Sequence, residues 1–313
     1  MLFINDIKEG DFLNYHYLCK QKQAMKSKNG RTYLSLKLQD KTGVIDAKVW
    51  DLGNDIQNFE ENDFIRVEGS VLLYQNDLQV KVNKIRRSAE GEYDPANYIP
   101  RTEKDIAEMA GQIRGYISSV TNLFLNELLT NIFISNNETA KAFASRSAAK
   151  TLHHGYYGGL IEHTLSVAQI CEFLCGQYKN VDRDVLICCA LLHDIGKIIE
   201  LSPFPDNSYT DDGQLLGHVY IGAEMAAREA SRIAKFPKAL ETLIKHCIIS
   251  HHGEYEFGSP KRPKIIEAFI LFCADNIDSR IKSFETAVNA DGMQAQWVGF
   301  NKQFDRFIRK TVY

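Results

Sequence analysis

The chain has 313 residues, a formal net charge of −3 and 44% apolar residues. This length suggests one large domain or two ordinary ones, and the composition is that of a soluble globular protein. The slight acidity excludes a globally basic nucleic-acid coat but leaves room for a local basic groove. No apolar run approaches the roughly 18–20 residues of a membrane span. The N-terminus has acids where a signal peptide would be basic, and the seven cysteines form no C-x-x-C pair. We therefore expect a cytoplasmic protein with reduced thiols and no membrane partner.

Residues 1–88 have the pattern of β-strands. Apolar and polar residues alternate over 32–38, and a D-K-T-G turn leads to a second strand over 44–50. Three further strands are expected downstream, over 64–69, 71–74 and 78–82. About five strands in this length are enough for a small barrel.

The pattern changes after residue 88. Residues 89–101 hold a glycine and two prolines without periodicity, which predicts a linker. Over 102–288, apolar residues recur at three- and four-residue spacing, which predicts an all-α domain. Residues 289–313 combine aromatic residues with cations, so we expect an amphipathic tail that docks as a helix. A contribution to a nucleic-acid path or to a subunit interface is the alternative. Residues 1–90 carry 14 cations against 13 acids, net +1, and the rest carries 23 against 27, net −4, which supports two domains.

A run of cations without an acid precedes the first clear strand. Such a run is usually a solvated loop, but this one lies directly before the expected strand that carries Tyr33. Cations beside an aromatic platform are how sequence-independent single-strand binders hold phosphates and stack bases. The candidate substrate-binding residues of this region are Lys20, Lys22, Lys26, Lys28, Arg31 and Tyr33.

Six polar side chains in apolar helical surroundings have the residue types that hold divalent metals. They are His163, His193, Asp194, His218, His251 and Asp275. Burying an unpaired charge is very costly, and a metal ion is the simplest compensation. Imidazole nitrogen together with carboxylate oxygen suits first-row ions such as Mn²⁺, Fe²⁺, Co²⁺ or Zn²⁺. Helical neighbours lie about 100° apart, so only one of His251 and His252 is expected to ligate, and His251 is favoured.

The order of these residues resembles that of a known family. The pattern H … HD … D of the HD-domain metal-dependent phosphohydrolases matches His163, His193-Asp194 and Asp275. In the subset with a second metal, two further histidines correspond to His218 and His251. The string KNGRTYLSLKLQDKTGVIDAKVWD resembles the nucleic-acid-binding OB-fold.

Taken together, the two halves resemble the YhaM-type 3′→5′ exoribonucleases. The phrases HHGYYGGLIEHTLSV, LLHDIGK and SHHGEYEFGSP are similar to that family as well. The resemblance implies a multidomain protein, with an N-terminal all-β OB-fold barrel followed by an all-α HD domain. It also implies Mn²⁺-dependent removal of nucleotides from the 3′ end of single-stranded RNA, and of single-stranded DNA as a possible second substrate, releasing 5′-mononucleotides.

Two-metal hydrolysis would give several residues a role. Asp194 would bridge two cations about 3.5–4 Å apart, which together activate water and stabilise the reacting oxygens. Lys197, one helical turn after His193, would neutralise the scissile phosphate or protonate the leaving 3′-oxygen, unless it is only an exposed helix-end lysine. The remaining candidate substrate contacts are His153, His154, His252 and Arg280.

Other functions remain open at this point. A nucleotide phosphohydrolase or a cyclic-dinucleotide phosphodiesterase would use the same metals, although neither needs an N-terminal β domain. A non-catalytic single-strand-binding factor is the third alternative. The strand polarity rests on the family resemblance alone, and a homo-oligomer is compatible with the sequence.

Overall fold

The structure, a computed structural model, describes residues 2–27, 29–75, 77–150, 154–289 and 296–312. The chain divides into two compact units, one of residues 1–101 with 204–206 and one of 102–203 with 207–313. Each unit has a hydrophobic core of its own. In the described part of the chain, no helix combines the length and the apolar character that crossing a membrane requires.

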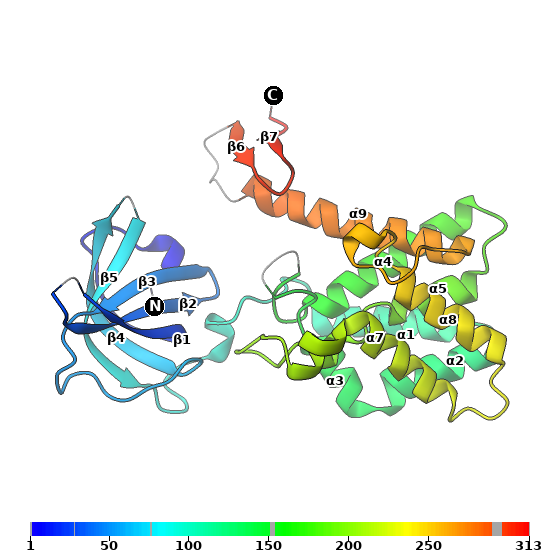
Figure 1. The fold of residues 1–313 in the computed structure, drawn as a ribbon, viewed down its shortest axis with the longest axis horizontal. Coiled ribbons are helices and arrows are strands. Elements are labelled where there is room, and N and C mark those ends of the chain that lie inside the picture. The colour runs from blue at the N-terminus through cyan, green and yellow to red at the C-terminus, as the bar shows by residue number, and fades with distance from the viewer. Residues whose placement is uncertain (1, 28, 76, 151–153, 290–295, 313) are drawn as a thin grey trace. The chain divides into compact units, whose positions relative to one another are not determined.

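The first unit is a closed β-barrel, drawn in blue to cyan in Figure 1. Its strands are β1 (Phe12–Lys26), β2 (Thr32–Asp40), β3 (Gly43–Val49), β4 (Phe64–Tyr74) and β5 (Asp77–Arg87). Two short 3₁₀ helices span Ile4–Asp6 and Pro95–Asn97. The order around the barrel is β1-β2-β3-β5-β4, closed by the pairing of β4 with β1. All pairs are antiparallel except β3 with β5. Alternate side chains such as Leu36 and Leu38 fill the interior, as the period of two predicts.

The barrel confirms the predicted fold, although the strands were not all predicted correctly. Strand β1 was missed, and most of the cationic run 20–31 lies on it rather than in a loop. The second half of β1 is exposed, so its sequence lacks the apolar alternation that marks a half-buried strand.

Strand β4 is a single strand where two were expected. The interruption is a β-bulge, because the register with β5 shifts between Glu68 and Gly69. A Cβ at Gly69 would lie 2.4 Å from the carbonyl oxygen of Lys81, so only glycine lets the two backbones approach this closely.

The second unit consists mainly of helices, shown from green to orange in Figure 1. They are α1 (Ile106–Ser119), α2 (Leu123–Thr130), a π-helix (Asn131–Ser135), α3 (Asn137–Ser145), α4 (Gly159–Gln177), α5 (Arg183–Leu192), α6 (Lys197–Glu200), α7 (Asp211–Ala230), α8 (Lys238–Ser250), a 3₁₀ helix (Tyr255–Phe257) and α9 (Ile266–Asn289). Helix α5 is buried from Val185 to its last residue and packs against α4, α8 and α9. The helices that carry the predicted ligands therefore surround one core.

The C-terminal tail is a β-hairpin rather than the expected amphipathic helix. Strands β6 (Trp297–Asn301) and β7 (Arg306–Arg309) pair in antiparallel fashion. The side-chain oxygen of Asn301 accepts hydrogen bonds from the backbone N–H groups of Gln303 and Phe304, which fixes a turn where a helix would have continued. The aromatic spacing of three and four residues imitated a helical period. Residues 290–295 of the predicted tail lie outside the described residues.

Candidate metal centre

His163 lies in the first turns of α4 and is held from behind by a carboxylate of α9. Its Nδ1 donates to Asp278 Oδ2 at 2.7 Å, and Asp278 also accepts from the hydroxyl of Ser166. The donated Nδ1 proton fixes the ring so that Nε2 faces the interior of the helical unit. There Nε2 lies 3.2 Å from Asp275 Oδ1 and 3.4 Å from Asp194 Oδ2.

The end of α5 delivers His193 and Asp194 to the same place. His193 Nδ1 donates to the carbonyl oxygen of Ala190 at 2.8 Å, so its Nε2 is also the free nitrogen. The two Nε2 atoms of His163 and His193 are 3.2 Å apart. Without a metal this distance requires a proton on one of the two nitrogens, and the raised pKa of His163 places it there; a cation can take the place of that proton. The arrangement therefore fits a cation shared by both rings.

A second pair of histidines approaches Asp194 from the opposite side. His218 follows Gly217, whose φ of 73° breaks α7 and starts its second segment at the histidine. His218 Nδ1 and its backbone N–H both donate to Glu200 Oε1 at 2.9 Å. His251, at the end of α8, donates from Nδ1 to the carbonyl oxygen of Ile248 at 2.6 Å. Their Nε2 atoms lie 3.5 and 3.7 Å from Asp194 Oδ1.

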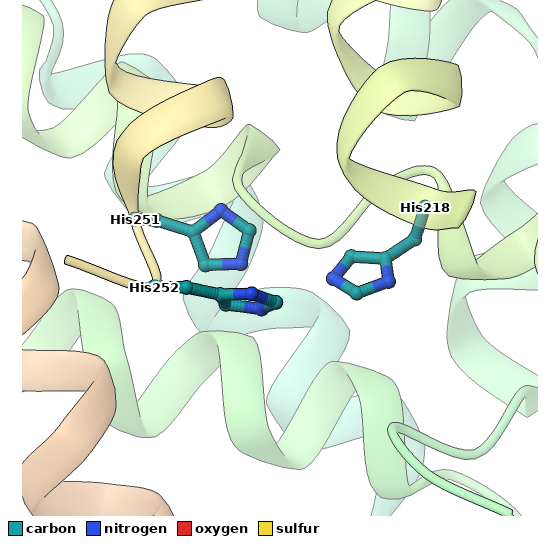
Figure 2. Close-up of side chains that lie close together, drawn as sticks. All are labelled: His218, His251 and His252. Atoms are coloured by element: carbon teal, nitrogen blue, oxygen red, sulfur yellow. The ribbon is translucent and has the colours of Figure 1, made fainter. Parts of the chain in front are cut away.

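His252 joins this second pair. Figure 2 shows the rings of His218, His251 and His252 facing one another, the first from α7 and the other two from the end of α8. One nitrogen of each lies within 4.8 Å of the others, which is a spacing that one metal ion can satisfy. The sequence favoured His251 over His252 as a ligand, whereas the structure brings both into reach.

Three buried polar atoms around Asp194 have no hydrogen-bond partner among the described residues. They are Asp194 Oδ1, His218 Nε2 and His252 Nδ1. Buried polar atoms are nearly always paired, with protein, water or an ion. Oxygen and nitrogen donors that converge without pairing are what divalent metals need, so the residues present fit a metal centre.

The electrostatics of the centre favour positive charge. Burial would lower the pKa of His163, but its hydrogen bonds to Asp194, Asp275 and Asp278 outweigh burial and raise it well above the usual value. For Asp194, burial would raise the pKa, but the charges of Lys197 and His193 outweigh burial and hold it well below the usual range. The acids are therefore ionised and ready to bind a cation.

Lys197 is part of this centre rather than an exposed helix-end lysine. Its Nζ lies 2.7 Å from Asp194 Oδ2. Burial lowers its pKa, but the attraction of Asp194 more than offsets this and keeps the amine charged. Lys197 thus adds a positive charge directly beside Asp194.

A cavity of about 310 Å³ opens onto the centre. Its lining includes Asp194, Lys197 and His252, together with Phe272 and Arg280 of α9. Arg280 is exposed, and the described residues offer it no ion pair that the structure records. His252 and Arg280, two of the predicted substrate contacts, therefore both line this cavity.

His154 does not line that cavity. It is buried, with Nε2 donating to Asp278 at 3.0 Å and Nδ1 3.0 Å from the hydroxyl of Tyr156. His154, predicted as a substrate contact, instead supports the carboxylate that holds His163. His153, the neighbouring predicted contact, lies outside the described residues.

In the barrel, the predicted nucleic-acid contacts divide into two groups. Lys20 Nζ donates to the carbonyl oxygens of Pro205 and Asp206, and Lys22 Nζ donates to that of Phe59. These two lysines already have protein partners. The others that the structure describes, Lys26, Arg31 and Tyr33, are exposed or half-buried on the surface, and Lys28 lies outside the described residues.

Sequence reasoning missed three residues of these sites. Trp50 stacks on Tyr33 with ring centroids 4.5 Å apart, which doubles the aromatic platform. Asp278 and Glu200 orient His163 and His218. Asp278 follows Asp275 by three residues, so it occupies the same face of α9, and this spacing was the available signal.

Comparison with known proteins agrees with both units. Residues 160–280 match the HD domain, and residues 20–87 match an OB-fold nucleic acid binding domain. Similar solved structures include the second OB-fold domain of replication protein A from Methanococcus maripaludis, with 22% identity, a TM-score of 0.23, and 29% of this chain and 96% of that chain covered. A replication protein A heterotrimer bound to ssDNA matches with 19% identity, a TM-score of 0.21, and coverage of 28% and 65%. Asparaginyl-tRNA synthetase from Entamoeba histolytica matches with 10% identity, a TM-score of 0.23, and coverage of 55% and 34%, so the chain spans about a third of that protein's length.

The HD domain is a family of metal-dependent phosphohydrolases, and the histidine and aspartate clusters of this chain could hold their metal. The match of residues 20–87 to an OB-fold nucleic acid binding domain supports nucleic-acid binding by the N-terminal unit. The chain therefore carries an OB-fold nucleic-acid-binding domain followed by a helical region with an HD domain, a combination that supports a nucleic-acid-binding hydrolase.

Proposed function

We propose that this protein is a YhaM-type 3′→5′ exonuclease that degrades single-stranded RNA, and single-stranded DNA less readily, with Mn²⁺ as its metal. The observation that carries the proposal is the orientation of the imidazoles around Asp194. Four histidines use Nδ1 for a hydrogen bond and direct Nε2 toward the two oxygens of that carboxylate, namely His163, His193, His218 and His251. The direction of degradation rests on the sequence resemblance.

The centre offers two adjoining sets of donor atoms. His163 and His193 adjoin Asp194 Oδ2, and Asp275 Oδ1 lies 3.2 Å from His163 Nε2. This set would hold one cation. On the other side, His218 and His251 adjoin Asp194 Oδ1, with His252 beside them, and would hold a second cation. When bound, two divalent cations supply Lewis-acid activation of water and of the phosphoryl oxygens.

The protein's own residues would position the substrate around this pair. Lys197 holds its charge beside Asp194 and would neutralise the phosphate that is cleaved. Arg280 would bind a neighbouring phosphate at the mouth of the cavity. A volume of about 310 Å³ is at the lower end for ligand pockets, which suits one terminal nucleotide at a time.

The barrel would hold the single strand. Tyr33 and Trp50 form a stacked platform, and Lys26 and Arg31 add exposed cations. Stacking on aromatic rings tolerates any base, and cations bind phosphates without reading sequence. An exonuclease that degrades RNA of any sequence needs such sequence-independent binding.

The test is digestion of single-stranded RNA labelled at its 5′ end, in the presence of Mn²⁺. We expect a descending ladder with mononucleotide product from the wild type, and no hydrolysis but retained RNA binding from Asp194→Ala. Asp212→Ala, an exposed acid of α7, is the matched control and should behave as the wild type. Wild-type rates from Asp194→Ala would overturn the proposal, and so would immediate release of the labelled 5′ nucleotide without a ladder.

A small-nucleotide phosphohydrolase or cyclic-dinucleotide phosphodiesterase is the second candidate, favoured by the size of the cavity. The double variant Tyr33→Ala, Trp50→Ala separates the two functions. An exonuclease should lose kcat/KM on long RNA, whereas an enzyme for small nucleotides should keep its rate. If the wild-type protein binds RNA without metal but hydrolyses no phosphodiester, the protein is instead a non-catalytic binding factor.

A further inference from the structure

The β6–β7 hairpin presents an aromatic face to solvent. Residues paired directly across an antiparallel ladder lie on the same side, and side chains two apart on a strand do as well. Trp297 pairs with Arg309, and Phe300 pairs with Phe307. These four side chains therefore share one face of the hairpin, whereas Ile308 points to the other face and is buried.

The aromatic rings of this face are open. Trp297, Phe300 and Phe307 are 57%, 52% and 65% exposed. Phe300 and Phe307 touch each other edge to face, with centroids 5.4 Å apart, and no other ring contact is recorded for either among the described residues. Three large rings gathered on one small exposed face mark an interaction site rather than scattered surface residues.

The charge around these rings selects the kind of partner. Residues 296–312 contain Lys302, Arg306, Arg309 and Lys310 against the single acid Asp305, a net charge of +3. The chain as a whole carries −3, so the cations are concentrated here. Exposed rings interleaved with cations are complementary to the bases and phosphates of a single strand. They are a poor match for a cationic or purely apolar partner.

The hairpin is also fixed in place on the helical unit. Phe304 packs edge to face against Phe284 of α9, with centroids 5.1 Å apart, and both strands contact that helix. Figure 1 shows the hairpin beside the C-terminal end of α9. The same helix carries Asp275 and Arg280 of the metal centre and its cavity.

We propose that this face, formed by Trp297, Phe300, Phe307 and Arg309, is a second binding site for single-stranded nucleic acid, separate from the barrel. Bases stack on the three rings, and Arg309 with its neighbouring cations binds the phosphates. The inference rests on the proposed function, because it takes the exonuclease substrate as the ligand. Through this face the helical unit binds the single-stranded nucleic acid independently of the barrel.

The first test measures the binding of a fluorescein-labelled oligouridine to the full-length protein by anisotropy, in EDTA so that no hydrolysis occurs. Phe300→Ala and Phe307→Ala should each weaken binding about five- to 150-fold, the loss expected for one stacked base. Arg309→Ala should lower the slope of log K against log salt by about 0.7, the value for one phosphate contact on a single strand. Phe173→Ala, an equally exposed ring on α4, is the control and should bind as the wild type.

A second measurement does not depend on removing a ring of the hairpin. Trp50→Phe leaves Trp297 as the only tryptophan of the chain. Addition of oligouridine should quench its fluorescence, and high salt should reverse the quenching. Unchanged fluorescence, together with wild-type affinity of Phe300→Ala and Phe307→Ala, would overturn the proposal.

Two further outcomes separate this inference from others. If the hairpin variants dissociate an oligomer in light scattering while RNA affinity is unchanged, the face is a subunit contact and the proposal is wrong. If the variants weaken binding but the wild type hydrolyses no RNA with Mn²⁺, the binding site stands and the exonuclease function fails.

Discussion

At the scale of single residues, four candidate ligand histidines each use Nδ1 for a hydrogen bond, which leaves Nε2 to bind a cation. The supports differ between the two halves of the centre. Asp278 holds His163, and Glu200 holds His218. Such partners orient the ring and raise its basicity as a ligand. The two cations should therefore depend on different supporting acids.

Asp278→Asn tests this dependence. The change keeps the shape of the side chain but removes the charge that orients His163, so Mn²⁺ affinity should fall about 10- to 100-fold. Titration calorimetry of the metal-free protein measures this, and the thermal midpoint checks that the variant folds. Glu285→Gln, an exposed acid of the same helix, should bind Mn²⁺ as the wild type does. Wild-type affinity from Asp278→Asn would show that the carboxylate has no part in metal binding.

Metal binding should release about one proton at pH 7. In the metal-free protein the pKa of His163 is raised well above its usual value, so the ring is protonated at neutral pH and a cation must displace that proton. Burial lowers the pKa of His251, so that ring is already neutral and releases none. Affinity should then rise about tenfold per pH unit and level off above the pKa of His163. Calorimetry in buffers of different ionisation enthalpy counts the protons, and a count near zero would contradict this assignment.

The raised pKa of His163 also makes the stability of the metal-free protein depend on pH. A protonated His163 stabilises the folded state fully below the pKa of an unfolded histidine, and this contribution is lost as pH rises through the folded-state pKa. The metal-free protein should therefore lose stability toward alkaline pH, and the metal-bound protein should not show this loss.

The residue types in the sequence predicted most of the side chains that converge at the candidate metal centre, but not the acids that support them. A histidine or aspartate inside an apolar run requires a partner, and this argument identifies ligands without a structure. The partner of His163 on another helix depends on packing, which the local sequence does not show. His154 was misplaced for the same reason, because a Gly- and Tyr-rich segment gives no sign that the ring is buried against Asp278.

At the scale of elements, the centre depends on a close approach of α6 and α7. Gly196 precedes α6, and a Cβ there would lie 2.1 Å from the carbonyl oxygen of His218 and 2.7 Å from the backbone nitrogen of Gly222. Only glycine lets the two backbones meet at the point where His218 is presented.

Gly196→Ala should therefore separate the two segments and move His218 away from Asp194. We expect a loss of about 1–3 kcal/mol in the free energy of unfolding, as for other overpacked sites, and a lower metal content. Gly115→Ala in the middle of α1 is the control, since its Cβ would meet nothing within 4 Å. The control should gain about 0.5–1 kcal/mol. Denaturant unfolding measures both, and a Gly196→Ala protein as stable as the wild type would contradict the packing argument.

The strands and helices predicted correctly are those in which buried residues recur regularly or continuously along the element. Strand β2 alternates, and α5 follows a capping aspartate, Asp182, into a continuous apolar run. Strand β1 and the hairpin were missed because their buried and exposed residues do not alternate regularly along the sequence. In the hairpin, a cross-strand pairing and the side-chain cap of Asn301 decide the structure, and neither is visible in hydrophobic spacing.

At the scale of the whole molecule, two separate cores predict two separate responses to ligands. The candidate metal ligands all belong to the helical unit, so Mn²⁺ should stabilise that unit alone, by about 2.7 kcal/mol at 100 times its Kd. Scanning calorimetry should show two transitions, of which only one shifts with Mn²⁺ and returns with EDTA. A single transition, or an equal shift of both, would show that the units do not unfold independently.

The division into two units follows from the sequence because the hydrophobic period changes from two to about 3.6 after residue 88. The boundary falls later in the structure, where the expected linker 89–101 packs with the barrel. Tyr98 explains the difference, since it is buried and its carbonyl oxygen accepts from the side chain of Gln39. A tyrosine between prolines gives no local sign of such a contact.

The metal content of the purified protein tests the central claim most directly. After removal of metal with EDTA, reloading with Mn²⁺ and desalting, elemental analysis of the wild type should find two ions per chain. Asp194→Ala should retain far less than one, because that carboxylate lies between both sets of ligands. A wild type that retains no metal, or an Asp194→Ala protein that retains two ions, would contradict the account.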